Sequence, residues 1–224
     1  MLFNILKDML KLIHISDTHN KHNQLLHLES GDIIVHSGDA TGMGYLSEVN
    51  DFIKWYGALP YKHKVFVAGN HDFLFQEDPI LAKQLCDDNG IIWLQDEARE
   101  IEGYKFYGTA DQPTFFDWAF NKTHEQLVRS YSIIPADTQI LITHCPPKNI
   151  LDYTISRYNP NGVCVGSEVL AAELPRLKQL KAHLFGHIHY SNGQKLLDGV
   201  VYSNGAICDE GYKPINKEGI IELL

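Results

Sequence analysis

The sequence predicts an α/β protein in which two packed sheets are flanked by helices. Short apolar runs rich in Ile, Val and Leu alternate along the chain with stretches whose apolar residues have helical spacing. The 224 residues are 44% hydrophobic and 21% charged, close to the globular average, which excludes a disordered chain, a collagen or a coiled coil. Because no repeat and no Gly/Ser/Pro-rich linker divides the chain, we expect a single domain over residues 1–224.

The predicted strands are short runs of aliphatic, β-branched and aromatic residues. They cover residues 11–16, 32–37, 64–68, 104–108, 139–143 and 181–185. After residue 195 the chain is expected to form further strands, with turns at Asp198-Gly199 and Asn204-Gly205.

The predicted helices lie between these strands. They cover residues 45–59, 79–88, 123–133 and 167–180. Asp78 and Thr123 precede two of them, and both side chains are suited to accept a hydrogen bond from the free N–H groups of a first helical turn. Pro175 lies inside the last helix and should break or kink it, because proline has no N–H to donate.

The charge balance limits the kinds of partner that the protein can have. Lys plus Arg number 19 and Asp plus Glu number 28, so the net charge is −9. An extended grip on nucleic-acid backbones needs clustered Lys and Arg, and we do not expect one. No run reaches the ~18 apolar residues that a membrane helix requires, so no membrane partner is expected. The oligomeric state leaves no signal in the sequence.

The cysteines and the N-terminus favour a cytoplasmic protein. The four cysteines are far apart in sequence and form no CxxC motif, so we expect reduced thiols rather than disulfides. Residues 1–12 are apolar in part, but Lys7, Asp8 and Lys11 interrupt them, and we therefore expect no signal peptide. Residues 1–8 precede Met9 and are interpreted as a short extension.

Polar residues follow the predicted strands at the points where the strands end. In α/β sheets, ligands bind beyond the carboxyl ends of the strands, so these side chains are expected to meet at one edge. They are Asp17 and His19, then Asp39, then Asn70 with His71 and Asp72, then His144, and finally His187 with His189.

These residue types suit a metal site. Carboxylate, amide and imidazole ligands together favour borderline divalent ions such as Mn, Fe, Zn or Ni. Asp-x-His and His-x-His place two side chains on the same side of an extended segment. Asp39 has two carboxylate oxygens and can bridge two ions ~3.5–4 Å apart, as in two-metal phosphoesterase sites. Each fragment alone also has a structural interpretation, as a helix cap, a turn or a loop histidine.

The ordered set of motifs resembles the calcineurin-like metallophosphoesterase superfamily. The motifs DxH, GD, GNH, H and GHxH all occur in order between Asp17 and His189, so the resemblance covers most of the chain. The flanking residues are similar to those of the brain-type metallophosphodiesterase branch. These segments read ISDTH at 15–19, HSGD at 36–39, AGNH at 68–71, LITHCPP at 141–147 and FGHIH at 185–189.

The resemblance implies a four-layer αββα sandwich of two mixed β-sheets flanked by helices, with a dinuclear metal site at one sheet edge. It implies two divalent ions, with Mn or Fe expected and Zn, Ni or Mg as alternatives. One ion would be held by Asp17, His19, Asp39 and His189, and the other by Asp39, Asn70, His144 and His187, so that Asp39 bridges them.

The resemblance also implies roles for the remaining site residues. His71 would contact the substrate phosphate together with Asn70 and protonate the leaving oxygen. A metal-bridging water, acidified towards neutral pH, would attack phosphorus. Beside two cations a protonated His71 needs a compensating anion, and we predict Asp72 as a second catalytic residue on that ground.

Departures from the superfamily pattern point to the substrate. Its protein phosphatases carry an Asp-Arg pair a few residues after GD, whereas this chain reads GDATGMG at 38–44. Without that arginine clamp we expect a singly charged diester, such as a small or cyclic nucleotide, rather than a monoester or a phosphoprotein. The chain keeps His187 where some brain-type members have Gly, so we expect a complete two-metal site.

Two further features bear on function. The aromatic segment 112–121 could stack a nucleobase through Phe116 and Trp118, or instead form a hydrophobic plug over the sheet. Cys145 follows His144, but we interpret it as a packing residue because a two-metal hydrolase attacks with water. The alternatives to a phosphodiesterase are a phosphomonoesterase or nuclease of the same superfamily, or a non-catalytic metal-binding scaffold.

Overall fold

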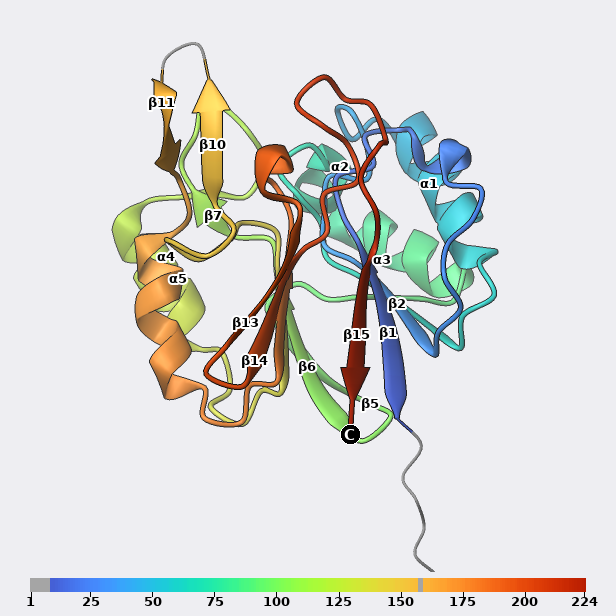
Figure 1. The fold of residues 1–224 in the computed structure, drawn as a ribbon. Helices are drawn as coiled ribbons and strands as arrows, with labels where there is room; N and C mark the ends of the chain where they lie inside the picture. Colours follow the sequence, from blue (N-terminus) through green and yellow to red (C-terminus); the bar gives the residue numbers. More distant parts are fainter. Residues whose placement is uncertain (1–8, 157–158) are drawn as a thin grey trace, which may run out of the picture.

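Two mixed sheets pack face to face, and helices cover their outer faces, in the computed structural model of the protein (Figure 1). The structure describes residues 9–156 and 159–224. The four layers confirm the predicted architecture. The single domain over residues 1–224 stays a prediction, and the extension expected at residues 1–8 lies outside the described residues.

The first sheet has its strands in the order β15-β1-β2-β3-β4. Strands β1 to β4 are parallel, and β15 pairs antiparallel with β1. Every residue of β2 is buried, as expected for an inner strand of a parallel sheet covered on both faces. The strands are β1 Leu10–Ile15, β2 Ile33–His36, β3 His63–Phe66, β4 Ile91–Trp93 and β15 Gly219–Leu223.

The second sheet has its strands in the order β13-β14-β12-β9-β6-β5. The four inner strands are parallel, and the two edge strands are antiparallel to their neighbours. The strands are β5 Glu97–Ile101, β6 Tyr104–Thr109, β9 Ile140–Thr143, β12 Ala182–Phe185, β13 Gly193–Leu197 and β14 Val200–Asn204. Strands β4 and β5 were not predicted, because β4 is very short and the charged sequence of β5 lacks an apolar run.

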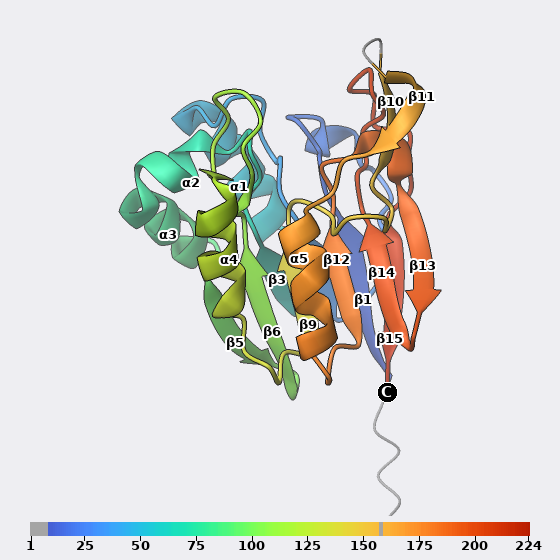
Figure 2. The same cartoon turned by 90° about the vertical axis from the view of Figure 1, so that its left-hand side faces the viewer.

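The helices form the two outer layers. Helices α1 (Leu46–Gly57), α2 (Phe73–Glu77) and α3 (Pro79–Asp88) lie on the first sheet, and α4 (His124–Ser132) and α5 (Glu168–Glu173) lie on the second (Figures 1 and 2). No helix in residues 9–156 and 159–224 is long and apolar enough to cross a membrane.

The predicted helix ends agree with the structure except at α5. Asp78 accepts a hydrogen bond from the Leu81 N–H, and Thr123 accepts one from the Gln126 N–H, so both predicted caps are confirmed. The helix predicted over 167–180 was too long. Helix α5 ends at Glu173 and a 3₁₀ turn follows, because Pro175 cannot donate to the preceding turn.

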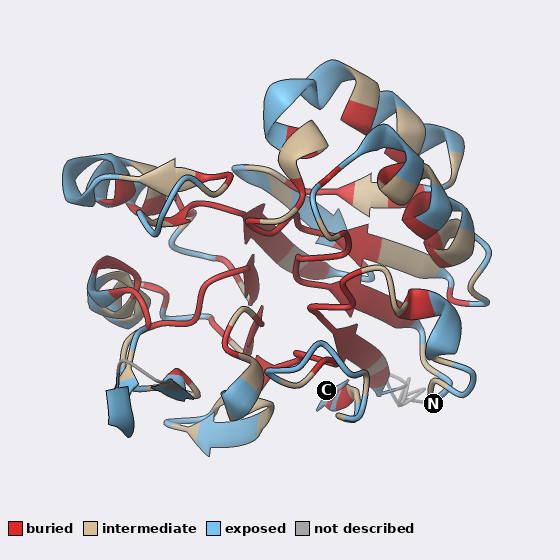
Figure 3. Ribbon diagram, turned by 90° about the horizontal axis from the view of Figure 1, so that it is seen from above, coloured by how far each residue is buried: buried red, intermediate tan, exposed pale blue. Residues whose placement is uncertain are grey.

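Several short elements stand at the end of the sandwich where the parallel strands finish. They are the hairpin of β10 (Tyr153–Ser156) with β11 (Asn159–Cys164), the pair β7 (Gln112–Pro113) and β8 (Asn121–Lys122), and the 3₁₀ turns His22–Gln24 and His189–Ser191. Seen from above, the loops in the middle of this end are buried, and the exposed segments lie at the periphery (Figure 3).

The two sheets are tied together at this same end. The Ser16 N–H, just after β1, donates to the Gly205 carbonyl after β14 over 2.7 Å. The Ile207 N–H donates back to the Ser16 carbonyl over 2.8 Å. These bonds bring the carboxyl ends of strands from both sheets to one place, and the polar residues of the sequence motifs follow those ends.

Candidate metal centre

The strand ends bring together all the residues predicted to bind metal. Asp17 and His19 follow β1, and Asp39 follows β2. The others follow β3 (Asn70), β9 (His144) and β12 (His187 and His189). Each strand therefore delivers its ligands to the same edge, as the motif order predicted.

The backbone at these positions is sharply bent. Four of the candidate ligands have a positive φ, at 54° for Asp17, 40° for His19, 55° for Asp39 and 68° for His187. Residues other than glycine seldom have a positive φ, and those that do cluster at functional sites. Gly38 has a φ of 111°, and a Cβ there would collide with the His144 ring, so only glycine allows His144 to approach the GD turn.

Three overlapping groups of ligand atoms share the site. Within each group, the atoms lie within 4.8 Å of one another. Asp39 belongs to two groups and His19 belongs to two, so the three groups form one continuous centre. The groups are Asp17–His19–His189, His19–Asp39–His71 and Asp39–His144–His187.

On one side of the centre, His19 and His189 converge on Asp17. His189 Nε2 lies 3.3 Å from Asp17 Oδ1. The Nε2 atoms of His19 and His189 are 3.2 Å apart. His19 Nε2 is also 3.8 Å from Asp39 Oδ2. Two imidazole nitrogens that face one another beside two carboxylates form a suitable donor set for a cation.

On the other side of the centre, His144 converges on Asp39 and Asn70. His144 Nε2 lies 3.3 Å from Asp39 Oδ2 and 3.1 Å from Asn70 Oδ1. The rings of His144 and His187 are 5.0 Å apart, edge to face. Asp39 thus has histidines on both sides, which is the arrangement that a bridging carboxylate requires.

Backbone carbonyls orient the rings from behind. His144 Nδ1 donates to the Ser37 carbonyl, and His189 Nδ1 donates to the Asp209 carbonyl, each over 2.9 Å. With Nδ1 used in this way, Nε2 of each ring is left to bind metal. The buried carboxylates, amide and oriented imidazoles therefore fit two borderline divalent ions.

Comparisons with known proteins identify the family of this chain. A family model described as calcineurin-like phosphoesterase matches residues 10–191. This chain belongs to the calcineurin-like phosphoesterase family. Metallophosphoesterase domain-containing protein 1 of Homo sapiens is 32% identical over 235 residues, covering 95% of this chain and 71% of that protein. The predicted family and its brain-type branch are confirmed, and the phosphoesterase is a hydrolase of phosphoric esters.

Two solved structures support the fold of the phosphoesterase. One has a TM-score of 0.68 at 14% identity and covers 96% of this chain and 100% of its own. The crystal structure of TT1561 of Thermus thermophilus has a TM-score of 0.58 at 13% identity and covers 88% of each chain. At these identities the likeness concerns the arrangement of the elements alone.

The buried carboxylates and the histidines next to them shift one another's pKa values. Burial alone would raise the pKa of Asp17, but its hydrogen bond with His189 and the nearby His144 hold it below the usual range. For His144 and His189, burial lowers the pKa, yet the adjacent Asp39 and Asp17 raise it to about 9. The site of the phosphoesterase therefore attracts positive charge, either as protons or as metal ions.

The remaining two imidazoles have the opposite shift. Burial lowers the pKa of His19 and that of His187 to about 4. Both rings are therefore neutral at pH 7, which is the form that binds metal.

His71 is less buried than His19 and His144, the other two histidines whose Nε2 lies within 4 Å of Asp39. Its Nδ1 donates to the Gly42 carbonyl over 2.6 Å, and its Nε2 lies 3.9 Å from Asp39 Oδ2. The Trp118 ring lies against the His71 ring, with centroids 4.1 Å apart and planes at 32°. Because Nδ1 is used by the bond to Gly42, Nε2 is the ring nitrogen that faces Asp39, and a substrate contact by His71 stays a prediction.

Asp72 is buried beneath the loops rather than turned toward the His71 ring. Its carboxylate accepts hydrogen bonds from the backbone N–H groups of Gly69, Ala40 and Thr41, and from the Thr41 hydroxyl. The predicted catalytic role of Asp72 stays a prediction. In the structure, the Asp72 carboxylate connects the GD and GNH turns through these hydrogen bonds.

One half of the aromatic segment 112–121 is packed against the site and the other half is exposed. Phe120 is buried, and the Ala119 N–H donates to the Asn70 carbonyl over 3.2 Å, so this half packs under the site. The Phe116 side chain is 75% exposed. Substrate contacts by Phe116 and Trp118 stay a prediction.

Some contributors to the site could not be found from sequence. The carbonyls of Ser37, Gly42 and Asp209 orient the imidazoles, but a carbonyl leaves no mark on residue type. Tyr212 packs against two of the candidate ligands from a segment that carries no motif. Cys145 is buried, and burial raises the pKa of its thiol to about 12, in agreement with a packing role.

Proposed function

We propose that this phosphoesterase hydrolyses small phosphodiesters with two divalent metal ions, and that His71 is its general acid. The observation that carries the proposal is the place of Asp39 between the two halves of the centre, with its Oδ2 lying 3.8 Å from His19 Nε2 and 3.3 Å from His144 Nε2. A single continuous cluster of buried carboxylates and imidazoles suits two neighbouring ions, and the proton donor beside it, His71, is what a catalytic site needs and a metal-binding scaffold does not.

We propose the following ligands for each ion on the basis of the donor set. Bound ions of this kind supply positive charge to a phosphate and lower the pKa of water towards neutrality. Mn or Fe is favoured, with Zn, Ni and Mg as alternatives. Asp17, His19, Asp39 and His189 would hold one ion, and Asp39, Asn70, His144 and His187 the other.

His71 is placed to donate a proton from Nε2. Because Nδ1 donates to the Gly42 carbonyl, the ring is fixed and only Nε2 can exchange a proton with a substrate. Trp118 limits rotation of the ring from one face. A leaving oxygen that departs toward this side would accept the proton from His71.

The charges around the centre support a diester over a monoester. Within residues 9–156 and 159–224, the ion-pair partners of Asp17 and Asp39 are histidines, with no Lys or Arg among them. A doubly charged monoester would gain more than a singly charged diester from a Lys or Arg at the site. The segment after the GD turn supplies Thr41 instead, and its hydroxyl is already bonded to Asp72.

The remaining features support a small substrate and a reducing compartment. The net charge of −9 opposes an extended nucleic-acid strand, so we propose a small phosphodiester such as a nucleotide. Cys86, Cys145, Cys164 and Cys208 are all free thiols, as in a cytoplasmic protein.

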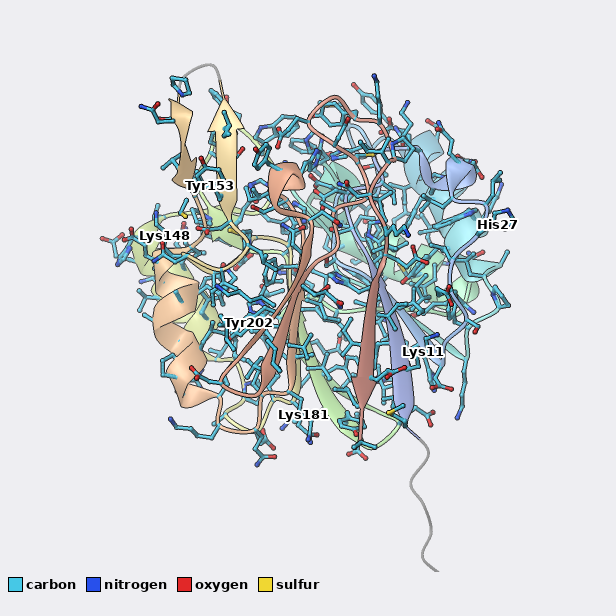
Figure 4. All side chains as sticks on the ribbon, in the orientation of Figure 1. Lys11, His27, Lys148, Tyr153, Lys181 and Tyr202 are labelled. Carbon is cyan, nitrogen blue, oxygen red and sulfur yellow. The ribbon has the colours of Figure 1, made fainter. Side chains whose placement is uncertain are left out.

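The test is hydrolysis of a chromogenic phosphodiester beside its matching monoester, with Mn²⁺ added or chelated away. We expect Mn²⁺-dependent cleavage that favours the diester. His71→Ala should lower turnover by about 10²–10⁴-fold while bound metal stays unchanged. His27→Ala is the matched control, since His27 is exposed on the outer side of the molecule (Figure 4).

The outcomes separate the candidate functions. Faster cleavage of the monoester would replace the diesterase with a phosphomonoesterase. Cleavage of neither compound by a protein that holds two ions would favour a scaffold, and loss of metal in His71→Ala would show that His71 is a ligand.

A further inference from the structure

The segment 208–214 joins the two strand ends that carry one half of the metal centre. The Cys208 N–H donates to the Asp17 carbonyl over 3.3 Å, which ties the segment to the DxH turn. The Asp209 carbonyl accepts from His189 Nδ1 over 2.9 Å, which ties it to the GHxH turn. The segment therefore contacts Asp17 and His189 at once, although neither contact is made by a ligand atom.

The segment is itself a tightly bonded turn. Asp209 Oδ1 accepts from the N–H groups of Gly211 and Lys213, over 2.8 and 2.9 Å. The Tyr212 N–H donates to the same Asp209 carbonyl that receives His189 Nδ1. These bonds fix the position of that carbonyl relative to Tyr212.

Tyr212 is held in a conformation that tyrosine rarely adopts. Its φ is 57°, in the left-handed region, where a bulky side chain is an outlier. This conformation directs the ring onto two candidate ligands. The Tyr212 ring meets the His19 ring edge to face at 4.7 Å and the His189 ring at 5.6 Å.

We propose that Tyr212 is a positioning residue for the ion held by His19 and His189, and that it controls the occupancy of that position alone. The ring limits the rotation of both imidazoles, while the Asp209 carbonyl fixes the tautomer of one of them. The inference rests on the proposed function, because it presumes that the centre binds two ions.

The other half of the centre is supported differently. The rings of His144 and His187 contact each other, and His144 is fixed by the Ser37 carbonyl and Asn70. The ring contacts of Tyr212 within the described residues are with His19 and His189. The two metal positions should therefore respond differently to the loss of this side chain.

A purely structural role for Tyr212 does not explain its placement. The side chain is 47% exposed and lies outside the hydrophobic core, so its burial contributes little to folding. Strain in a non-glycine residue persists only where the surroundings impose it. Here the surroundings that impose it are the bonds of the 208–214 turn.

The experiment measures Mn²⁺ binding to metal-free protein by calorimetry in two single-site backgrounds. In His187→Ala, the position next to Tyr212 remains, and adding Tyr212→Ala should weaken Mn²⁺ binding by about 10–100-fold. In His189→Ala, the other position remains, and Tyr212→Ala should leave its affinity unchanged. Tyr212→Phe should leave the Mn²⁺ affinity of each single-site background unchanged, because the contacts are made by the ring.

Tyr153→Ala is the matched control. Tyr153 stands on the β10–β11 hairpin at the same end of the molecule (Figure 4), and its ring contact within the described residues is with Tyr190. Equal losses in both backgrounds, or no loss in either, would overturn the inference while leaving the proposed function intact. A wild-type protein that binds no Mn²⁺ would overturn both.

Discussion

Two regions of the molecule bury histidines, and the partners of these histidines differ. In the strands, His14 lies between Ser203 and Ser37, with each bond 2.9 Å long. His183 bonds the Thr143 hydroxyl over 2.9 Å. At the sheet edge, the histidines instead face carboxylates and one another, as His144 faces Asp39.

The two environments have opposite effects on protonation for His144 and His189, whereas the pKa values of His19 and His187 are lowered like those of the strand histidines. Burial lowers the pKa values of His14, His36 and His183 to about 3, so these rings are neutral and serve the fold. Burial acts on His144 and His189 as well, but the adjacent carboxylates raise their pKa values to about 9. Burial alone therefore does not distinguish a metal ligand from a core histidine, whereas ligand atoms that lie close to the carboxylates of Asp17 or Asp39 do.

The largest expected effect comes from removing a carboxylate that the edge histidines face and the strand histidines lack. Asp39→Ala should lose metal at both positions and lower the hydrolysis rate on the order of 10³-fold or more, because Asp39 is common to both halves. Metal content by mass spectrometry and diester hydrolysis would be measured together. Activity that survives with full metal content would contradict the bridging role.

The strand histidines should make the protein sensitive to acid. Their folded-state pKa lies below the unfolded value of 6.5, so their stabilisation is present above pH 6.5 and is lost as the pH falls toward 3. Each should cost about 3 kcal/mol between pH 6.5 and pH 4. Urea unfolding across this range would measure it.

A substitution in the interior would assign this acid effect. His183→Gln can keep the bond with Thr143 without titrating, so it should make the acid slope shallower, whereas His27→Gln should not. An unchanged slope in His183→Gln would contradict the assignment.

His144 and His189, at the sheet edge, should have the opposite pH dependence. In metal-free protein, His144 and His189 have folded-state pKa values above 6.5, so their stabilisation is complete below pH 6.5 and is lost as the pH rises through about 9. The decline should be about 3 kcal/mol for each group. Saturating Mn²⁺ should abolish it, because metal-bound imidazoles carry no proton to lose.

The same unfolding experiment, carried out with and without metal, measures this effect. If the free energy of unfolding declined equally with and without Mn²⁺, His144 and His189 would not be metal ligands.

The smallest expected effect concerns the ring next to His71. Trp118→Ala should lower kcat about tenfold by loosening the His71 ring, and Trp118→Phe should restore most of the loss. Leu196→Ala is the control, because Leu196 is an exposed residue of the edge strand β13. A change in KM alone for Trp118→Ala would assign this residue to substrate binding instead.

The sequence predicted the candidate ligands at the sheet edge better than it predicted the edge strands and the residues that pack around those ligands. Asp17, Asp39 and His144 were located because each follows an apolar strand, and parallel strands finish at one edge. Strand β5 was missed because an exposed edge strand can carry charges in place of an apolar run. Tyr212 was missed because its contacts depend on a turn fixed by long-range packing, which no local pattern records.

The most direct test of the account is a crystal structure grown with Mn²⁺, with anomalous differences recorded at the manganese absorption edge. The account predicts two peaks ~3.5–4 Å apart on either side of Asp39, and none beside His14, His36 or His183. A single peak, or peaks that leave Asp39 without a metal, would contradict the claim that the edge histidines form one dinuclear centre.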